Sequence, residues 1–485
     1  MLDDIIKERL KKRDNLEKAG KDVYPASVKR THTASDVVTN WSALLRKKSK
    51  VTVVGRVFAI RGQGGISFLD IKDEFGALQA VASKNKTKDF TIVRDNLDIG
   101  DFIEATGSLF VTKKGEKSVD VKTWRVITKS IRPIPSEWYG IADPETRLRQ
   151  RYLELLLNSE ARELFRKKSV FWQSVREFLK TNGFLEVETP VLQSIAGGAD
   201  AEPFGTHMNA LDIDLSLRIS LELPLKKLLV AGYEKVFEIG RVFRNEGIDA
   251  EHLQDYSQME YYWAYQDYEG GMEFVEKMYK YAIKQTLGTL KTKRGDIVID
   301  WGKKWPHFDY FEIFKKHTGL DLNTITDAEL VQYAKKQNID ASKHPGRGRL
   351  VDAIFKRIRH TLIQPCFVIN PPVEIVPLAK RLSSNPKQVA RFQPVAGGTE
   401  LGTGYSELND PVDQRKRFED QMKLREAGDK EAQQLDEEYL EAMEYGMPPN
   451  HGFGFSERLF SILVDKPIRE TVLFPLMRPK SKDKK

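Results

Sequence analysis

The spacing of apolar residues along the chain changes its period several times. Residues 2–19 repeat at helical spacing, residues 51–128 alternate in short runs, and from residue 158 onward helical stretches and strands are mixed. Periods of 3.6 and 2 are typical of helices and strands respectively. The pattern predicts an α+β chain with a basic helical extension over residues 1–48, a strand-rich domain over residues 49–135, and a larger domain over residues 136–485 that carries a mainly helical insertion at about residues 310–365.

The strand-rich domain contains five alternating runs, and a polar helical piece near residues 88–97 separates the third run from the fourth. This order predicts a five-stranded oligonucleotide-binding (OB) β-barrel. Arg56, Phe68 and Gln79 lie on its first three strands. There an aromatic ring can stack on an unpaired base, and an arginine or glutamine can read a base edge. For Phe68 alone, burial in the core is the more common role.

The most informative stretch of the larger domain runs from Val236 to Tyr265. Two apolar runs joined by a charged connection predict an antiparallel hairpin. Arg244 and Glu246 share one face where the first strand ends, and the second strand places four polar residues on one face: Tyr256, Gln258, Glu260 and Tyr262. An apolar core needs no such combination, so the hairpin is a candidate site.

Other candidates are single residues at turns and element ends. Gly197-Gly198 either lets the backbone approach a ligand or makes a plain turn. Glu222, in the first turn of a predicted helix, is either a surface acid or a ligand-facing one. Thr403, Tyr405 and Glu407 alternate and so share a strand face, and Arg458 stands where a glycine-rich strand meets a helix.

The charge of the chain is distributed unevenly. The net charge of +8 consists of +10 over residues 1–135, from 27 Lys+Arg against 17 Asp+Glu, and −2 over the remainder. A basic N-terminal region is typical of a segment that meets a polyanion, although a solvated basic face without a partner is the alternative. The helix over residues 2–19 suits nucleic acid or a membrane surface, but it lacks the Trp and Phe anchors of an interfacial helix.

Composition excludes several classes of protein. At 485 residues, with 40% hydrophobic and 31% charged residues, the chain reads as soluble and globular. No apolar run is long enough for a membrane span, and no signal-peptide core is present, so a cytoplasmic protein without a membrane partner is expected. The single Cys366 excludes an internal disulfide, and no P-loop or G-x-G-x-x-G motif follows a strand.

Three stretches carry a resemblance to a known family. TNGFLEVETPVL, FRNEGIDAEHLQDYSQMEYYWAYQDY and GFGFSERLF resemble the three signature motifs of class II aminoacyl-tRNA synthetases. LRISLELPLKKLLVAGYEKVFEIGRVFRNEG and TGYSELNDPVDQRKRFEDQ are similar to the bacterial lysyl branch. The resemblance implies an antiparallel-sheet catalytic domain, an anticodon-binding OB barrel and a homodimer whose interface includes the region of Pro190. It also implies ATP-dependent attachment of L-lysine to tRNA(Lys) through a lysyl-adenylate, with Mg²⁺.

The resemblance further implies a role for each matching residue. Arg244 and Arg458 would be catalytic. ATP would be bound by Arg244, Glu246, His252, Tyr256, Glu400 and Arg458. Lysine would be bound by Gly198, Glu222, Arg244, Glu260, Tyr262, Thr403, Tyr405 and Glu407. Glu400 and Gln393 would hold the metal, and Arg56, Phe68 and Gln79 would contact the anticodon.

The chain departs from the family pattern at several positions. Gln393 stands where a second metal-binding glutamate is usual, and a neutral amide is a weaker Mg²⁺ ligand than a carboxylate. Thr403 replaces a usual asparagine of the lysine pocket. Glu251 and Leu253 flank His252 in place of an arginine and an asparagine.

Three other functions are weighed against lysyl-tRNA synthesis. An aspartyl or asparaginyl enzyme would need cations where Glu222 and Glu407 stand. A relative that lysylates a protein would lack the N-terminal barrel. A catalytically silent RNA-binding protein would be expected to lose Arg244 or Arg458, and both are present.

Overall fold

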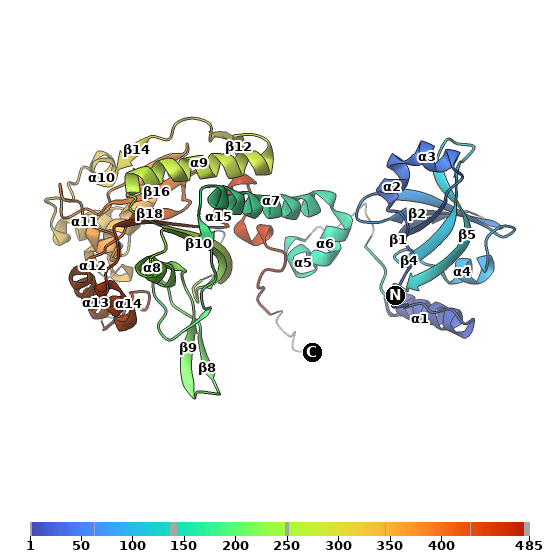
Figure 1. The fold of residues 1–485 in the computed structure, drawn as a ribbon, viewed down its shortest axis with the longest axis horizontal. Helices are drawn as coiled ribbons and strands as arrows, with labels where there is room; N and C mark the ends of the chain where they lie inside the picture. Colours follow the sequence, from blue (N-terminus) through green and yellow to red (C-terminus); the bar gives the residue numbers. More distant parts are fainter. Residues whose placement is uncertain are drawn as a thin grey trace. The chain divides into compact units, whose positions relative to one another are not determined.

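The computed structural model describes residues 2–62, 64–135, 143–247, 252–344, 346–426 and 428–479. The chain divides into two compact units, one comprising Met1–Arg147 and Tyr152–Leu157, the other Leu148–Arg151 and Asn158–Lys485. Within the described ranges, none of the helices has the length and apolar character needed to span a membrane. The first unit contains a barrel and the second an antiparallel sheet with helices, as Figure 1 shows.

The barrel of the first unit confirms the predicted strand order. Its strands pair in the closed order β1-β2-β3-β5-β4, and helix α4 lies between the third and fourth strands in sequence. The bounds are β1 (Lys50–Arg61), β2 (Ile66–Lys72), β3 (Ala77–Ser83), α4 (Phe90–Asn96), β4 (Phe102–Val111) and β5 (Lys117–Thr128), with α2 (Ala34–Thr39) and α3 (Trp41–Arg46) before them. Alternate residues of the strands fill the barrel interior, among them Val51, Val53, Leu69 and Val119.

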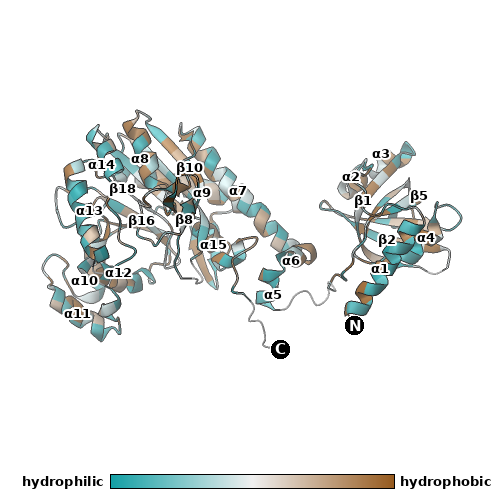
Figure 2. Ribbon diagram, turned by 90° about the horizontal axis from the view of Figure 1, so that it is seen from below, coloured by the Kyte–Doolittle hydropathy of each residue, from teal (hydrophilic) through white to brown (hydrophobic). Residues whose placement is uncertain are grey.

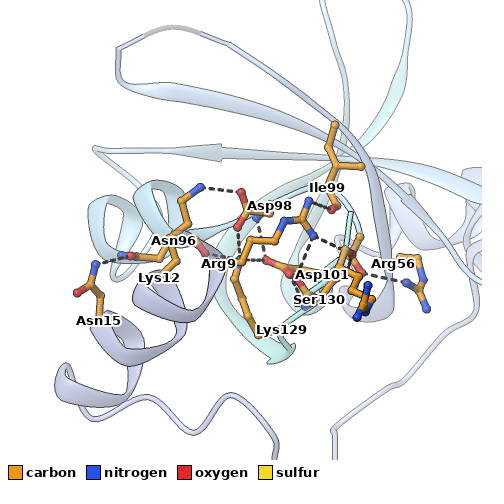
Figure 3. A network of polar contacts seen from close by, with 12 residues as sticks. Arg9, Lys12, Asn15, Arg56, Asn96, Asp98, Ile99, Asp101, Lys129 and Ser130 are labelled. Atoms are coloured by element: carbon orange, nitrogen blue, oxygen red, sulfur yellow. Dashed lines mark hydrogen bonds and ion pairs between the residues drawn. The ribbon is translucent and has the colours of Figure 1, made fainter. Parts of the chain in front are cut away.

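Helix α1 (Leu2–Lys18) precedes the barrel and packs against it through polar contacts. Arg9 is buried and donates to the carbonyl oxygens of Ser130 (2.9 Å) and Ile99 (3.0 Å), as Figure 3 shows. Lys12 Nζ lies 2.6 Å from Asp98, which also accepts from the buried Lys129. Hydrophilic residues cover most of the helix (Figure 2), but its basic residues are thus partly used to hold it on the barrel.

The sheet of the second unit is almost wholly antiparallel, which confirms the predicted α+β class. Its strand order is β14 (His307–Asp309), β15 (Cys366–Ile369), β16 (Arg391–Ala396), β18 (Thr403–Ser406), β19 (Asn450–Ser456), β11 (Asp255–Ala264), β10 (Lys235–Phe243) and β6 (Leu185–Glu186), with β17 (Thr399–Glu400) on β16. Among the described residues of this sheet, the β14/β15 and β10/β6 pairs are the parallel ones. The predicted hairpin is present, with Glu238 opposite Glu260 and Val242 opposite Tyr256.

Helices cover the two faces of this sheet differently. On one face α7 (Ser159–Thr181) and α9 (Tyr268–Leu287) lie side by side (Figure 1). They enclose an aromatic-rich core with Phe237, Tyr261 and Phe453. The residues next to Phe237 and Tyr261 in sequence point to the other face of the sheet. There α8 (Glu222–Val230) packs on Val236 and Tyr262. The polar residues of the hairpin therefore face α8, away from the main core.

The segment after β14 contains three helices, α10 (Tyr310–Thr318), α11 (Asp327–Lys336) and α12 (Gly346–Arg359). The other elements of the second unit are β7 (Leu192–Gln193), β8 (Gly205–Met208), β9 (Ile213–Leu217), β12 (Lys291–Arg294), β13 (Ile297–Asp300), α13 (Pro411–Glu426), α14 (Glu437–Glu444) and α15 (Arg458–Leu463). Helices α5 (Pro144–Arg149) and α6 (Arg151–Leu157) belong mostly to the first unit.

A buried ion pair joins the hairpin to the segment before Pro190. Glu238 accepts from Arg218 (2.7 Å) through one oxygen and from the Thr189 amide (2.9 Å) and hydroxyl (2.7 Å) through the other. We expect Glu238→Ala to lower the free energy of unfolding by about 3–5 kcal/mol, because it leaves the Arg218 guanidinium buried without its partner. Urea denaturation measures this loss. The control is Glu234→Ala, which changes an exposed glutamate directly before β10. A loss below about 1 kcal/mol would contradict the role.

Candidate active site

Three neighbouring strands place their polar residues on the α8 side of the sheet. Glu260 and Tyr262 of β11 lie opposite Gly454 and Gly452 of β19, which in turn lie opposite Thr403 and Tyr405 of β18. A Cβ atom at Gly452 would lie 2.3 Å from both the Tyr262 ring and Glu407 Oε1. The alternating glycines of GFGFSER therefore leave room for the polar side chains beside them.

These side chains line a cavity of about 280 Å³. The cavity brings together every residue predicted for lysine binding: Gly198, Glu222, Arg244, Glu260, Tyr262, Thr403, Tyr405 and Glu407. Gly198 has φ +85°, and a Cβ there would approach Glu222 Cβ to 2.8 Å. Its backbone therefore packs closely against Glu222 at the edge of the cavity, where only glycine fits without strain.

Behind two of the lining acids lies an ammonium group that sequence reasoning missed, on a lysine that does not itself line the cavity. Lys226 of α8 is fully buried, and its Nζ lies 2.5 Å from Glu222 Oε1 and contacts Glu407 Oε2. Its Nζ lies 5.8 and 5.4 Å from the ring centroids of Tyr262 and Tyr405. Burial lowers the pKa of Lys226, but Glu222 and Glu407 more than reverse this and raise it above its usual value, so it stays charged.

Lys226 takes only one oxygen from each acid. Glu407 Oε1 is buried and has no hydrogen-bond partner among the described residues, and it lies beside Gly452, which lines the cavity. Burial raises the pKa of the Glu407 carboxyl well above its usual range, and Lys226 opposes the rise. An unpaired carboxylate oxygen at the base of a pocket is a fitting acceptor for a second ammonium group.

Glu260 is held by a dense set of donors. Its Oε1 accepts from Ser220 Oγ (2.8 Å), the Leu221 amide (2.9 Å) and Gln258 Nε2 (2.5 Å), and its Oε2 accepts from the Tyr262 hydroxyl (3.0 Å). Burial, followed by the nearby charge of Glu222, raises the pKa of Glu260. The charged side chains that line the cavity are five acids against three arginines, a formal charge of −2, which suits a cationic ligand: Asp200, Glu222, Glu260, Glu400 and Glu407 against Arg244, Arg391 and Arg458.

A second chamber of about 860 Å³ shares one wall with this pocket. It is lined by all the residues predicted for ATP binding: Arg244, Glu246, His252, Tyr256, Glu400 and Arg458. Arg244 and Tyr256 line both cavities, and the Arg244 guanidinium lies 5.7 Å from the centre of the Tyr256 ring. Of the two residues that flank His252, Leu253 lines the chamber, whereas Glu251 lies outside the described residues.

Glu400 stands at the centre of a basic cluster on the chamber wall. Its carboxylate lies 3.1 Å from Arg359 and 3.8 Å from Arg391, and its carbonyl oxygen accepts from Arg458 at 3.4 Å. Burial raises the pKa of Glu400, but these arginines outweigh burial and lower it below its usual value. Gln393, the other residue predicted for the metal, lines the same chamber next to Glu400.

Arg458 is positioned by the residue before it. Glu457 is fully buried, contacts Lys168 of α7, and accepts from the Ser257 amide of β11 at 3.2 Å. These contacts fix the junction between β19 and α15 against the hairpin. Arg458, the first residue of α15, then lines both the chamber and the smaller pocket.

The chain matches two family models, one at each part of the molecule. Residues 143–478 match the class II tRNA synthetases of the D, K and N group, and residues 51–127 match the OB-fold nucleic acid binding domain. Among curated proteins, lysine–tRNA ligase from Carboxydothermus hydrogenoformans is 42% identical over 484 residues, covering 99% of both chains. The chain belongs to the lysine–tRNA ligase family. The lysine–tRNA ligases of Roseiflexus castenholzii (43%) and Fervidobacterium nodosum (38%) match over similar lengths.

The lysine–tRNA ligase relatives match the chain over the barrel as well as the catalytic unit. On the barrel, Phe68 and Gln79 lie on the outer faces of β2 and β3, since Leu69, Leu78 and Ala80 fill the interior. Phe68 is half-buried, so the expectation that it belongs to the core does not hold.

Arg56 is not brought together with Phe68 and Gln79. It pairs with Lys72, donates to the Gly100 carbonyl at 3.2 Å and stacks on Phe102. A bulge between Val57 and Ala59 shifts the face of β1, so that Arg61 lies opposite Phe68 and contacts Asp70 through two 2.7 Å hydrogen bonds. Since Asp70 lies opposite Gln79, Arg61 is the β1 arginine that joins the predicted surface.

Proposed function

We propose that this protein attaches L-lysine to tRNA(Lys) in two steps that both take place in the cleft described above. In the first, a carboxylate oxygen of lysine attacks the α-phosphorus of ATP, so that lysyl-adenylate forms and pyrophosphate leaves. In the second, the terminal ribose hydroxyl of tRNA attacks the lysyl carbonyl and AMP leaves. The observation that carries this proposal is a pocket of three carboxylates joined to a basic chamber through Arg244.

Activation needs alignment and charge neutralisation more than proton transfer. The lysine carboxylate is already ionised at neutral pH, so the first step requires no general base. Arg244 lines both cavities and is therefore placed to bind the lysine carboxylate and the α-phosphate together. Arg458 would stabilise the charge that develops on the phosphates, and Tyr256 would stack on adenine. Glu246 and His252 would contact the nucleotide, and burial raises the pKa of Glu246.

Selection of lysine follows from the charges of the small pocket. The ε-ammonium would bind Glu407 Oε1 and the second oxygen of Glu222, the two positions that Lys226 leaves open. Glu260, with Gly198 and Tyr262, would receive the α-amino end, while Thr403 and Tyr405 form the side wall. A neutral competitor would cover Glu407 Oε1 without offering it a donor, which is costly.

We also propose one Mg²⁺ ion, carried in with the phosphates of ATP. The donor set fits a single ion, because Glu400 offers one carboxylate oxygen that is only loosely paired, and Gln393 adds an uncharged amide. Glu400 would hold the ion with Gln393 beside it. When bound, the ion supplies positive charge to the phosphates. Within the described residues, no group of three or more His, Cys, Asp or Glu side chains forms a closed metal site.

Anticodon recognition is proposed for the outer face formed by Arg61, Phe68 and Gln79. We expect Arg61→Ala to raise the KM for tRNA(Lys) roughly 10–100-fold, because an arginine that reads a base contributes on that scale. Lysine-dependent ATP–pyrophosphate exchange, which needs no tRNA, should be unchanged. Arg56→Ala, on the same strand but held at Gly100, is the matched control and should leave the KM for tRNA within about twofold. The reverse ranking of the two variants would restore Arg56 as the contact.

A homodimer is proposed on the surface around Pro190. Leu185, Val191 and Leu192 are 39–48% exposed, and β6 is the edge of the sheet. Light scattering should give twice the 55.6 kDa chain mass, and Leu192→Asp should shift the protein toward the monomer. Leu211→Asp, exposed between β8 and β9, should leave the dimer intact. A wild-type monomer at micromolar concentration would contradict the proposal.

Aminoacylation of tRNA with labelled lysine tests the proposed function, which we place in the cytoplasm, where tRNA, ATP and lysine meet. The full-length protein should charge tRNA in a lysine- and ATP-dependent manner. Lysine-dependent exchange without transfer to tRNA would favour a protein-lysylating enzyme. The absence of exchange with any amino acid would leave an RNA-binding role.

A further inference from the structure

Helix α12, which belongs to the insertion, presents a basic edge to the nucleotide chamber. Asp352, Lys356 and Arg359 follow one another at spacings of four and three residues, and all three line the chamber. The helix carries five basic residues against one acid: Arg347, Arg349, Lys356, Arg357 and Arg359 against Asp352. Arg359 lines the nucleotide chamber but not the amino acid pocket, which distinguishes it from Arg244 and Arg458.

The contacts of Arg359 leave part of its guanidinium unused. Its Nη1 lies 3.1 Å from Glu400 Oε2, whereas its Nε is buried and has no hydrogen-bond acceptor in the described part of the chain. A buried donor on a charged group is rarely left without an acceptor. Together with Arg391 and Arg458, it gives the wall around Glu400 three positive charges against one negative charge.

This wall is better suited to an anion than to several cations. Gln393 contributes no charge, and one oxygen of Glu400 is occupied by Arg359. The planar guanidinium matches the geometry of two phosphate oxygens. Arg359 contacts Glu400, which lines both cavities, but it lines only the nucleotide chamber itself. The phosphates farthest from the lysine carboxylate would therefore lie beside it.

We propose that Arg359 binds the terminal phosphates of ATP directly, so that the protein neutralises with a guanidinium the charge that a second divalent ion would otherwise carry. The inference rests on the proposed function, since it requires ATP in this chamber. Arg359 would then also stabilise the departing pyrophosphate, because the same oxygens gain charge as the bond to the α-phosphorus breaks.

Binding of α,β-methylene-ATP to the full-length protein, measured by calorimetry in the presence of Mg²⁺, tests the inference. Arg359→Ala should weaken binding of the analogue, and of inorganic pyrophosphate, by about 10–100-fold, because a charge-assisted contact is lost. Binding of lysine alone should stay within about twofold, and Arg359→Lys should recover part of the loss. Arg357→Ala is the matched control, since Arg357 is on the same helix, is exposed and donates to the carbonyl of Gln337.

Electron paramagnetic resonance of Mn²⁺ counts the ions bound with the analogue. One ion per chain is expected for the wild type, and Arg359→Glu, which adds a carboxylate, should raise the number to two. Analogue binding unchanged in Arg359→Ala, or two or more ions in the wild type, would overturn the inference while leaving the proposed function intact. Failure of the wild type to bind the analogue at all would instead count against the proposed function.

Discussion

Glu407→Gln is expected to raise the KM for lysine by roughly 10²–10³-fold while the KM for ATP stays nearly unchanged. The substitution keeps the shape of the side chain but removes the charge that the substrate ammonium meets in a closed pocket. Removing one partner of a buried ion pair costs about 3–5 kcal/mol, which corresponds to this range. ATP–pyrophosphate exchange at varied lysine and ATP concentrations measures both constants.

A rise in the KM for lysine without a rise in the KM for ATP distinguishes a role of Glu407 in the pocket from a general loss of folding. Glu438→Gln, which removes an exposed carboxylate paired with Lys227, should leave both constants as they are. If Glu407→Gln raised the KM for lysine and for ATP equally, Glu407 would not belong to the side-chain pocket.

Lys226→Met is expected to lower the free energy of unfolding by about 3–5 kcal/mol and to make lysine binding depend on pH. Without the internal ammonium, Glu222 and Glu407 lie buried side by side with no cation between them. The other ionisable groups that face them are Glu260, Tyr262, Tyr405 and Tyr439, and none of these is a cation.

The sign of the pH effect follows from the carboxyl that loses its partner. Burial raises the pKa of Glu407, and in the wild type Lys226 opposes that rise. In Lys226→Met the pKa should rise further, so that the acid is protonated at neutral pH and must lose a proton to bind lysine. The KM for lysine should therefore be roughly 10–100-fold higher at pH 7 and fall as pH increases.

Saturating lysine should restore part of the lost stability, because the substrate brings back one ammonium group. Thermal denaturation with and without lysine measures this recovery. Lys227→Met, which changes the half-buried neighbour that pairs with Glu438, should show neither effect. A stable Lys226→Met protein with a pH-independent KM would show that the buried ammonium does not organise the pocket.

The fold and most of the site residues follow from local patterns in the sequence. Alternation predicted the five barrel strands and the hairpin, since a strand face needs only a period of two. The long helix α7 follows the same local logic, because Asn158 is a common capping residue and its Oδ1 accepts from the amides of Glu160 and Ala161.

What the sequence did not predict depends on contacts between distant segments or on local irregularity. The bulge between Val57 and Ala59 was not visible in the alternation, and it places Arg61 rather than Arg56 opposite Phe68. Lys226 was overlooked because a lysine on a helix is normally exposed. Its i,i+4 spacing from Glu222 was visible, but its pairing with Glu407, 181 residues later, is a tertiary contact.

Arg359 was missed for a related reason. The insertion showed no chemical motif, and its helix α12 reads as a solvated basic segment until the fold places it beside Glu400. The pairing of Arg359 with Glu400 spans 41 residues and links the insertion to β17. The composition of residues 310–365 therefore does not reveal that Arg359 lines the nucleotide chamber, because that placement depends on the tertiary fold.

The most direct test of the account compares lysine with norleucine in ATP–pyrophosphate exchange by the wild-type protein. Norleucine has the same chain without the ε-ammonium, so it would fill the pocket and leave Glu407 Oε1 without a donor. Exchange with lysine is expected, together with a kcat/KM for norleucine lower by about 10³-fold or more. Comparable exchange with the two amino acids would contradict the claim that the carboxylates around Lys226 select the substrate.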